Sequence, residues 1–180
     1  MKEDNCIIET ERLKLRELRM DDINPLSLVL SDPESMKFYP HPFSKEEVGK
    51  WIEWNLDNYR RHGFGLWAVI LKDTNELIGD CGITMQTVEN ETYPEIGYHI
   101  RKEYCRKGFA SEAASACLTF GFTIMKFPKI ISYMKSDNIP SRGVAEKNGM
   151  KFVRAFRKEV QGKLVDDEVL YCKENTDHQQ

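Results

Sequence analysis

The stretch from Tyr104 to Ala113 contains the residues with the clearest chemical potential in this chain. It follows an apolar run and opens a long amphipathic pattern. A strand that ends in a small-residue loop and continues as a helix presents backbone N–H groups at the positive helix end. Gly108 would let an anion approach the backbone closely, and Arg106 and Lys107 add positive charge beside it. The stretch therefore predicts a binding site for a phosphate-bearing ligand.

The bulk composition indicates one globular domain. The chain has 180 residues, of which 41% are hydrophobic and 31% charged, and its net charge is −3. This length suffices to bury a core without cross-links. The mild negative charge argues against nucleic acid or an anionic membrane as a partner. No apolar run reaches membrane-spanning length and no signal-peptide pattern occurs, so we expect a cytoplasmic protein.

The cysteines and histidines lack the spacing of a cross-linked or metal-binding protein. The five cysteines are scattered, form no C-x-x-C pair, and have no ligand spacing with the four histidines. Buried or idle thiols in a reducing compartment are the expected state. We therefore expect neither a disulfide framework nor a metal site.

The first two helices are predicted from capping residues and apolar repeats. A short helix to about residue 30 should be capped by Asp21 or Asn24. Ser44 and Glu47 form a capping box before a second amphipathic segment, which should end near residues 62–63.

The third and fourth helices lie in the second half of the chain. Small apolar residues from 110 to 125 recur at three- and four-residue intervals, which predicts a long helix with a tight small-residue face, ended by Pro128. Asn138 should cap the fourth helix, which residues 148–149 close.

Seven strands complete the prediction, near residues 12–18, 66–71, 77–85, 93–100, 130–134, 152–160 and 163–172. Turns are expected at residues 72–75 and at Gln161-Gly162, and a polar link at residues 86–92. The order β-α-α-β-β-β-α-β-α-β-β predicts a single-domain α/β (α+β) fold with a mixed central sheet and helices on both faces. A Rossmann-type nucleotide enzyme is a weaker functional alternative, because no G-x-G-x-x-G follows the first strand.

Four motifs occur in order along nearly the whole chain: Glu9-Thr10-Glu11-Arg12-Leu13-Lys14-Leu15-Arg16, Glu95-Ile96-Gly97-Tyr98, Gly108-Phe109-Ala110-Ser111-Glu112-Ala113, and Asn138-Ile139-Pro140-Ser141 followed by Glu146-Lys147-Asn148-Gly149-Met150. Together with the element order, they resemble the GNAT superfamily of N-acetyltransferases, closest to the branch of ribosomal-protein N-terminal (alanine/serine) acetyltransferases. Two departures are Cys105, where the family often has Gln or Arg, and Met150, where Phe is frequent.

The resemblance implies acetyl-CoA as co-substrate, without a metal. It implies one N-acetyltransferase domain over residues 1–173 with a polar tail at 174–180, and a sheet splayed between the fourth and fifth predicted strands. The diphosphate would bind the loop amides, and the pantetheine arm would pair with the strand edge. The coenzyme-binding residues so implied are Tyr98, Ile100, Arg106, Lys107, Gly108, Phe109, Ala110, Ser111 and Asn138.

Acetyl transfer to an amine requires a base and a proton donor for the leaving thiolate. Glu95 is the expected base, because desolvation in an apolar cleft raises the pKa of a carboxylate; a solvent-facing or ion-paired glutamate is the alternative. Ser141 matches a family hydroxyl that can bind the leaving sulfur, although serine in a first helical turn also satisfies backbone groups. Tyr133 or Tyr171 could take its place as proton donor.

The acceptor is expected to be a primary amine of a protein N-terminus or of a small molecule. Residues 38–43 and Trp67 could line its pocket, and Asp166 and Asp167 could receive a cation. Strand alternation turns His99 away from Tyr98, which favours a structural role. We expect direct transfer in a ternary complex by a monomer or homodimer. The rival reading is a non-catalytic regulatory module that binds acetyl-CoA.

Overall fold

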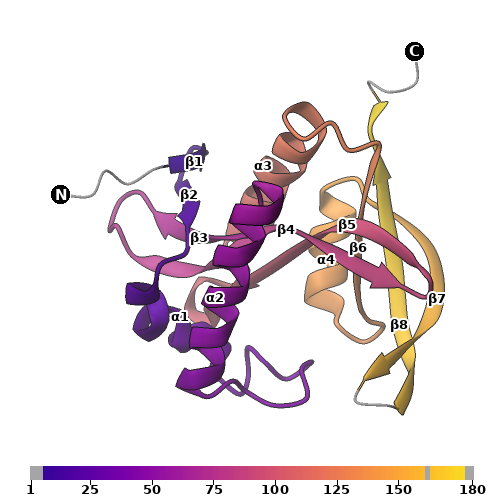
Figure 1. Cartoon of the computed structure of the whole chain (residues 1–180), viewed down its shortest axis with the longest axis horizontal. Helices are drawn as coiled ribbons and strands as arrows, with labels where there is room; N and C mark the ends of the chain where they lie inside the picture. Colours follow the sequence, from indigo (N-terminus) through magenta and orange to yellow (C-terminus); the bar gives the residue numbers. More distant parts are fainter. Residues whose placement is uncertain (1–5, 161–162, 177–180) are drawn as a thin grey trace.

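The protein is described by a computed structural model over residues 6–160 and 163–176, with side chains described outside residues 158–166. Figure 1 shows one open sheet with helices packed on it, and the described strands follow the order β1-β2-β3-β4-β5-β6-β8-β7. The strands are β1 (Cys6–Glu9), β2 (Leu13–Glu17), β3 (Leu66–Leu71), β4 (Leu77–Val88), β5 (Glu91–Ile100), β6 (Lys129–Lys135), β7 (Lys151–Val160) and β8 (Lys163–Glu174). The α-helices are α1 (Ile23–Leu30), α2 (Lys45–His62), α3 (Phe109–Thr123) and α4 (Ile139–Lys147), and short 3-10 turns span Met20–Asp22 and Lys102–Tyr104.

The predicted mixed α/β single-domain fold is confirmed, with one strand more than the seven expected. The extra strand, β1, has only four residues and pairs antiparallel with β2 at the sheet edge. So short a run shows too little alternation to be recognised in the sequence. The polar link expected at residues 86–92 is also mostly strand, because β4 continues to Val88 and β5 begins at Glu91.

The helix boundaries largely follow the predicted capping chemistry. The Ser44 hydroxyl accepts the Glu47 N–H at 3.2 Å while the Glu47 carboxylate accepts the Ser44 N–H at 2.7 Å, and Gly63 ends α2 with a φ of 78°. The cap predicted for α1 is wrong, since the residue at that position is Asp22, without a side-chain capping bond. The third helix ends at Thr123, well before Pro128.

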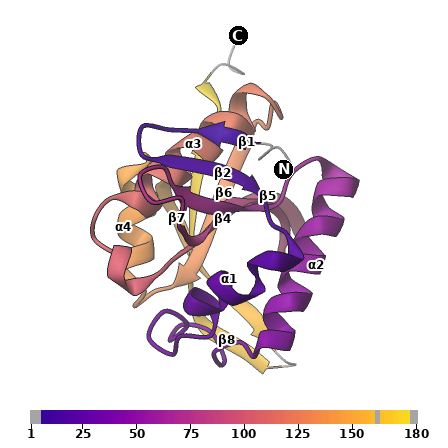
Figure 2. The same cartoon turned by 90° about the vertical axis from the view of Figure 1, so that its left-hand side faces the viewer.

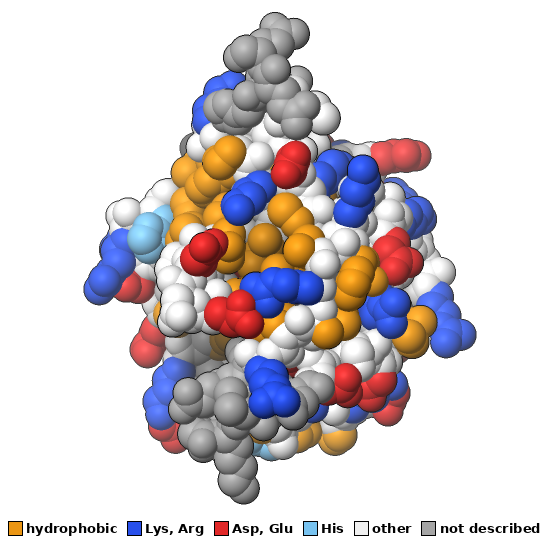
Figure 3. Space-filling model, turned by 90° about the vertical axis from the view of Figure 1, so that its right-hand side faces the viewer, with side chains coloured by type: hydrophobic (Ala, Val, Ile, Leu, Met, Phe, Trp, Pro, Cys, Tyr) orange, Lys and Arg blue, Asp and Glu red, His pale blue; other side chains and the backbone are white. Residues whose placement is uncertain are grey.

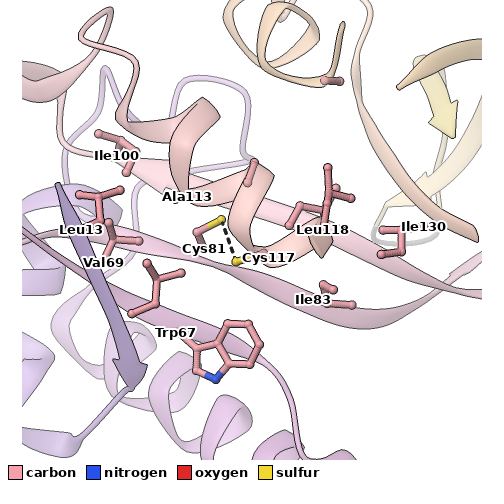
Figure 4. Close-up of a cluster of buried hydrophobic side chains, with 14 of the residues drawn as sticks. Leu13, Trp67, Val69, Cys81, Ile83, Ile100, Ala113, Cys117, Leu118 and Ile130 are labelled. Carbon is pink, nitrogen blue, oxygen red and sulfur yellow. Dashed lines mark hydrogen bonds between the residues drawn. The ribbon is translucent and has the colours of Figure 1, made fainter. Parts of the chain in front are cut away.

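The helices cover the two faces of the sheet separately. Figure 2 shows α1 and α2 on one side of the central strands and α3 on the other, in agreement with two separate core clusters. Figure 4 shows the larger cluster, in which Ala113 and Cys117 of α3 lie against the sheet. A Cβ atom at Gly121 would lie 2.6 Å from side-chain atoms of Ile83 and Ile130, so the small-residue face of α3 is what permits this close packing.

The only parallel pairing among the described strands joins β5 to β6 and consists of the pair Glu95 and Ile131. Beyond this pair the two strands separate, whereas β5 stays paired with β4 as far as Ile100. The predicted splay is therefore present, and it leaves the β5 edge after Glu95 without a neighbouring strand. Such an edge offers backbone donors and acceptors to an extended ligand.

The end of the sheet near β7 carries apolar and charged side chains of both signs side by side (Figure 3). Phe152 is 56% exposed and Val153 50% exposed on this edge strand.

At the C-terminal end, β8 runs to Glu174, and the buried Asn175 donates to the carbonyls of Phe122 and Phe127, each at 3.2 Å. The first residues of the predicted polar tail are thus packed, and residues 177–180 lie outside the described residues, as does the predicted turn at Gln161-Gly162.

Candidate active site

The loop before α3 has the conformation that an anion-binding helix start requires. Gly108 is the N-cap of α3 with a φ of 85°, and Arg106 also has a positive φ, 61°. These left-handed residues turn the chain so that the first-turn amides of Phe109, Ala110 and Ser111 face out of the helix end without intrahelical acceptors. The predicted phosphate-binding residues are therefore together at one helix N-terminus.

Thr10 and Arg12 of the N-terminal segment hydrogen-bond to the loop before α3 and to its first turn, and these contacts were not predicted from the sequence. Glu112, in the first turn of α3, accepts hydrogen bonds from the Thr10 hydroxyl at 2.6 Å, the Arg12 N–H at 3.0 Å and Arg12 Nε at 2.6 Å. Arg12 also donates to the Lys107 carbonyl at 3.0 Å. Burial opposes ionisation, but these hydrogen bonds from Thr10 and Arg12 lower the pKa of Glu112. The partners are about one hundred residues apart in the chain, so no local pattern could reveal them.

A hollow of about 380 Å³ opens beside the start of α3. It is lined by Arg12, Lys107, Gly108, Ser111, Glu112, Ser115, Lys147 and Asn148. Three of these residues are cationic and one is acidic, and the acidic residue is already paired with Arg12. The hollow thus has the size and charge to receive a phosphorylated group next to the helix end.

Tyr98 and Ser141 face each other across the splay. The Tyr98 hydroxyl donates to the Ser141 carbonyl at 2.8 Å, and the Ser141 hydroxyl donates to the Tyr98 oxygen at 3.1 Å. Asn138 caps α4 by accepting the Ser141 N–H at 3.2 Å. Burial raises the pKa of Tyr98, so its phenol is protonated near neutral pH. The structure brings these three predicted residues together where β5 and β6 separate.

The two alternative tyrosines occupy different environments. Tyr171 is 1% exposed, donates to Glu146 at 2.8 Å and accepts from Arg142 Nε at 3.1 Å. Tyr133 lies on β6, and its pKa is raised by burial and by the nearby Glu95 carboxylate. Tyr133 is therefore placed near the predicted base, whereas Tyr171 is held within the α4 contact.

Glu95 lies at the point where the two strands begin to separate. It pairs with Thr84 of β4 on one side and with Ile131 of β6 on the other, and its side chain is half-buried. Its carboxylate extends along the strand, since Oε2 lies 3.5 Å from where a Cβ atom at Gly97 would be. Glu95 and Tyr98 point to opposite faces of β5, so the predicted base and the predicted proton donor flank the splay from two sides.

Other residues singled out from the sequence have mainly structural contacts. Trp67 is fully buried and packs on Phe120 of α3 at a ring distance of 5.2 Å, which places it in the core. The exposed Asp167 accepts a hydrogen bond from the Ser136 hydroxyl. The Asp166 side chain lies outside the described side chains.

His99 belongs to a network whose partners the sequence reading did not identify. Its Nδ1 lies 2.6 Å from Asp80 Oδ1, and its Nε2 lies 2.5 Å from the Tyr39 hydroxyl. Asp80 is fully buried and also accepts a hydrogen bond from Trp51 Nε1 at 2.8 Å. Tyr39 is part of the predicted acceptor loop at residues 38–43, so this loop does lie against β5.

In the parts of the chain that the structure describes, no group of three or more His, Cys, Asp or Glu side chains is arranged to hold a metal ion. None of the helices in the same residues is both long and apolar enough to span a bilayer. The five cysteines are free, and the Cys81 and Cys117 sulfur atoms lie 3.7 Å apart in the core (Figure 4).

Comparisons with known proteins identify the family. The sequence model of the Acetyltransferase (GNAT) domain matches residues 12–151. An uncharacterized N-acetyltransferase p20 of Bacillus licheniformis is 32% identical over 164 residues, covering 87% of this chain and 90% of that protein. A GNAT-family acetyltransferase structure from Bacillus anthracis superposes with a TM-score of 0.77 and 32% identity, over 93% of this chain and 98% of the other.

A more distant likeness shows the fold alone. RimL, a ribosomal L7/L12 α-N-protein acetyltransferase solved with coenzyme A, has a TM-score of 0.75 at 19% identity, over 94% of this chain and 98% of the other. The family match and the two relatives at 32% identity carry the assignment. The chain belongs to the GNAT acetyltransferase family and is an acyl-CoA-dependent N-acetyltransferase.

Proposed function

We propose that this protein transfers an acetyl group from acetyl-CoA to a primary amine, by direct attack in a ternary complex. The observation that carries the proposal is the position of the α3 start relative to the β5–β6 splay. The α3 start offers backbone amides and cations to the diphosphate of the coenzyme. The splay offers an unpaired strand edge and the hydroxyls of Tyr98 and Ser141 to the pantetheine arm. RimL, which shares the fold, was solved with coenzyme A.

The coenzyme is proposed to bind along the α3 and α4 side of the sheet. Its diphosphate accepts hydrogen bonds from the amides of residues 106–111, and Arg106 and Lys107 neutralise its charge. Its pantetheine amides pair with the backbone of β5 near Tyr98 and Ile100. Asn138 uses its side-chain oxygen to cap α4, which leaves its NH2 group as the donor toward the pantetheine.

The chemistry is proposed to divide between the two faces of β5. The Glu95 carboxylate accepts a proton from the acceptor ammonium, directly or through a water molecule, and the freed amine attacks the thioester carbon. Backbone N–H groups beside Tyr98 stabilise the oxyanion. The Ser141 hydroxyl turns from Tyr98 to donate its proton to the departing thiolate. The proton that the attacking nitrogen loses as the intermediate collapses then restores the Ser141 hydroxyl, relayed through the Tyr98 phenol, which burial keeps protonated by raising its pKa.

The acceptor is proposed to be a protein N-terminus or a small-molecule amine that enters from the α1–α2 side. An assay of CoA thiol release with a panel of amines and N-terminal peptides, with products identified by mass spectrometry, tests this. Acetylated amine and intersecting initial-rate lines are the expected results. Absence of turnover with every amine, or parallel lines that indicate a covalent acetyl-enzyme, would contradict the proposal.

A further inference from the structure

One face of β5 carries a row of polar residues that the proposed mechanism uses only in part. Glu95, Gly97 and His99 alternate along the strand and therefore point to the same face. Tyr133 follows two residues after Ile131, the partner of Glu95 on the parallel strand β6. It is therefore level with Gly97 on the other side of the splay.

The centre of this row lacks a side chain. A Cβ atom at Gly97 would lie 3.5 Å from Glu95 Oε2 and 3.5 Å from Leu66 Cδ2. The Glu95 carboxylate thus leans over Gly97 in the direction of His99. Four residues of strand separate Glu95 from His99, a Cα distance of about 13 Å. A small molecule of matching length that lies over Gly97 would contact both side chains through two different groups.

Contacts with Asp80 and Trp51 hold the His99 ring in one orientation. Asp80, which is fully buried, accepts Nε1–H from Trp51, and its other oxygen lies 2.6 Å from His99 Nδ1; a carboxylate only accepts hydrogen bonds, so toward it Nδ1 is the donor. The neutral ring then has its lone pair on Nε2. Trp51 also packs edge-on against the ring at 5.9 Å. Nε2 is therefore a hydrogen-bond acceptor held at a set place on this face.

The side chain that occupies His99 Nε2, that of Tyr39, comes from outside the sheet. Its hydroxyl oxygen lies 2.5 Å from His99 Nε2, within hydrogen-bond distance, and the two rings lie 5.4 Å apart. Tyr39 comes from the connection between α1 and α2 and is 38% exposed. Tyr39 belongs to none of the buried core clusters, so a donor group of another molecule that displaces it would take the place of its hydroxyl.

Building on the proposed function, we propose that His99 is an acceptor-specificity residue. Its Nε2 accepts a hydrogen bond from a second N–H or O–H group of the amine substrate, at the place that the Tyr39 hydroxyl occupies in the free protein. The reacting amine meanwhile lies near Glu95. The substrate class that fits is an amine with a second donor, such as an amino alcohol, a diamine or a peptide N-terminus with its first amide.

Two amines of equal length test this assignment. 3-Amino-1-propanol carries the second donor and n-butylamine lacks it. Wild-type protein should acetylate the amino alcohol with a kcat/KM about tenfold higher or more, the value of one satisfied hydrogen bond. His99→Phe, which keeps a ring against Trp51 and removes both nitrogens, should bring this ratio close to one. Tyr39→Phe, the matched control at the exposed end of the network, should preserve it.

The ratio separates specificity from stability, because loss of folded protein lowers both rates equally. A ratio near one in the wild type, or an unchanged ratio in His99→Phe, would overturn the assignment. A second measurement requires neither a variant nor turnover. With 13C-labelled histidine and bound CoA, 3-amino-1-propanol should shift the His99 ring signal and n-butylamine should not. If CoA itself fails to bind, the proposed function fails; if CoA binds and His99 does not respond to the amino alcohol, only this inference fails.

Discussion

The hydrogen bonds that fasten Glu112 to the N-terminal segment give a stability prediction that can be worked from the structure. Glu112 accepts three hydrogen bonds, from the Thr10 hydroxyl and from two groups of Arg12. Glu112→Gln keeps the size of the side chain but replaces one carboxylate oxygen with an NH2 group. In either orientation of the amide, the NH2 group faces a donor of Thr10 or Arg12, so at least one hydrogen bond is lost. The hydrogen bonds that remain are to a neutral acceptor instead of a charged one.

The size of the expected loss in the free energy of unfolding depends on how exposed Glu112 and Arg12 are. Hydrogen bonds to a charged group contribute about 1.5–3 kcal/mol each when shielded from solvent. The Glu112 side chain is 19% exposed, but that of Arg12 is 43% exposed, so water screens the ionic part. We expect a loss of about 2 kcal/mol in the free energy of unfolding. For a chain of this size, that lowers Tm by about 4–8 °C.

The loss of stability caused by Glu112→Gln should be larger at neutral than at acidic pH. The pKa of Glu112 is lower in the folded protein than its ordinary value, because the hydrogen bonds from Thr10 and Arg12 outweigh burial. A group with a lowered folded pKa adds stability above its unfolded pKa and loses it as the pH falls through the folded pKa. The difference in the free energy of unfolding between wild type and Glu112→Gln should therefore be largest near pH 7 and decrease below about pH 4.

Urea unfolding of both proteins at about pH 7 and about pH 3.5 measures this difference. Glu53→Gln is the control, because it removes an equal charge from an exposed position of α2. Its effect should be small at both pH values. If Glu112→Gln lowers the free energy of unfolding no more than Glu53→Gln at pH 7, or lowers it equally at both pH values, the Glu112 hydrogen bonds do not stabilise the fold as proposed.

Three further substitutions test the proposed site. Glu95→Gln should lower kcat by about 100-fold near neutral pH and leave CoA affinity unchanged in calorimetry; unchanged turnover would rule out Glu95 as the base. Ser141→Ala should lower kcat by about tenfold with little change in the KM for acetyl-CoA, as measured by steady-state kinetics, and a change in KM alone would indicate only a capping role. Gly108→Ala should cost about 1 kcal/mol or more in urea unfolding, because φ is 85° there, and should weaken CoA binding; full retention of both would contradict the required left-handed turn.

Much of the fold could be predicted because local patterns determine it. The capping box at Ser44 and Glu47 and the small-residue face of α3 each produced the element expected from them. The splay also followed from the element order of the family. β1 was missed because four residues carry too little pattern, and the end of α3 was misplaced because Pro128 lies beyond a non-helical segment.

The parts of the candidate site that lie within one contiguous segment could be predicted from the sequence. The contacts between residues far apart in the chain could not. The anion-binding loop is a contiguous segment, and Asn138 and Ser141 share one helical turn. Asp80 meets His99 only through the register of two neighbouring strands, and Tyr39 meets it from a connection sixty residues away. Alternation correctly turns His99 away from Tyr98, but alternation does not show which residues a side chain will contact.

Calorimetric titration with CoA and with pantetheine tests whether the start of α3 binds the diphosphate of the coenzyme. In the proposed complex, main-chain amides and cations at the start of α3 contact the diphosphate, which pantetheine lacks. We expect CoA to bind with micromolar affinity and pantetheine to bind about 100-fold more weakly or not at all. Absence of CoA binding, or equal affinity for the two compounds, would rule out diphosphate recognition at this helix start.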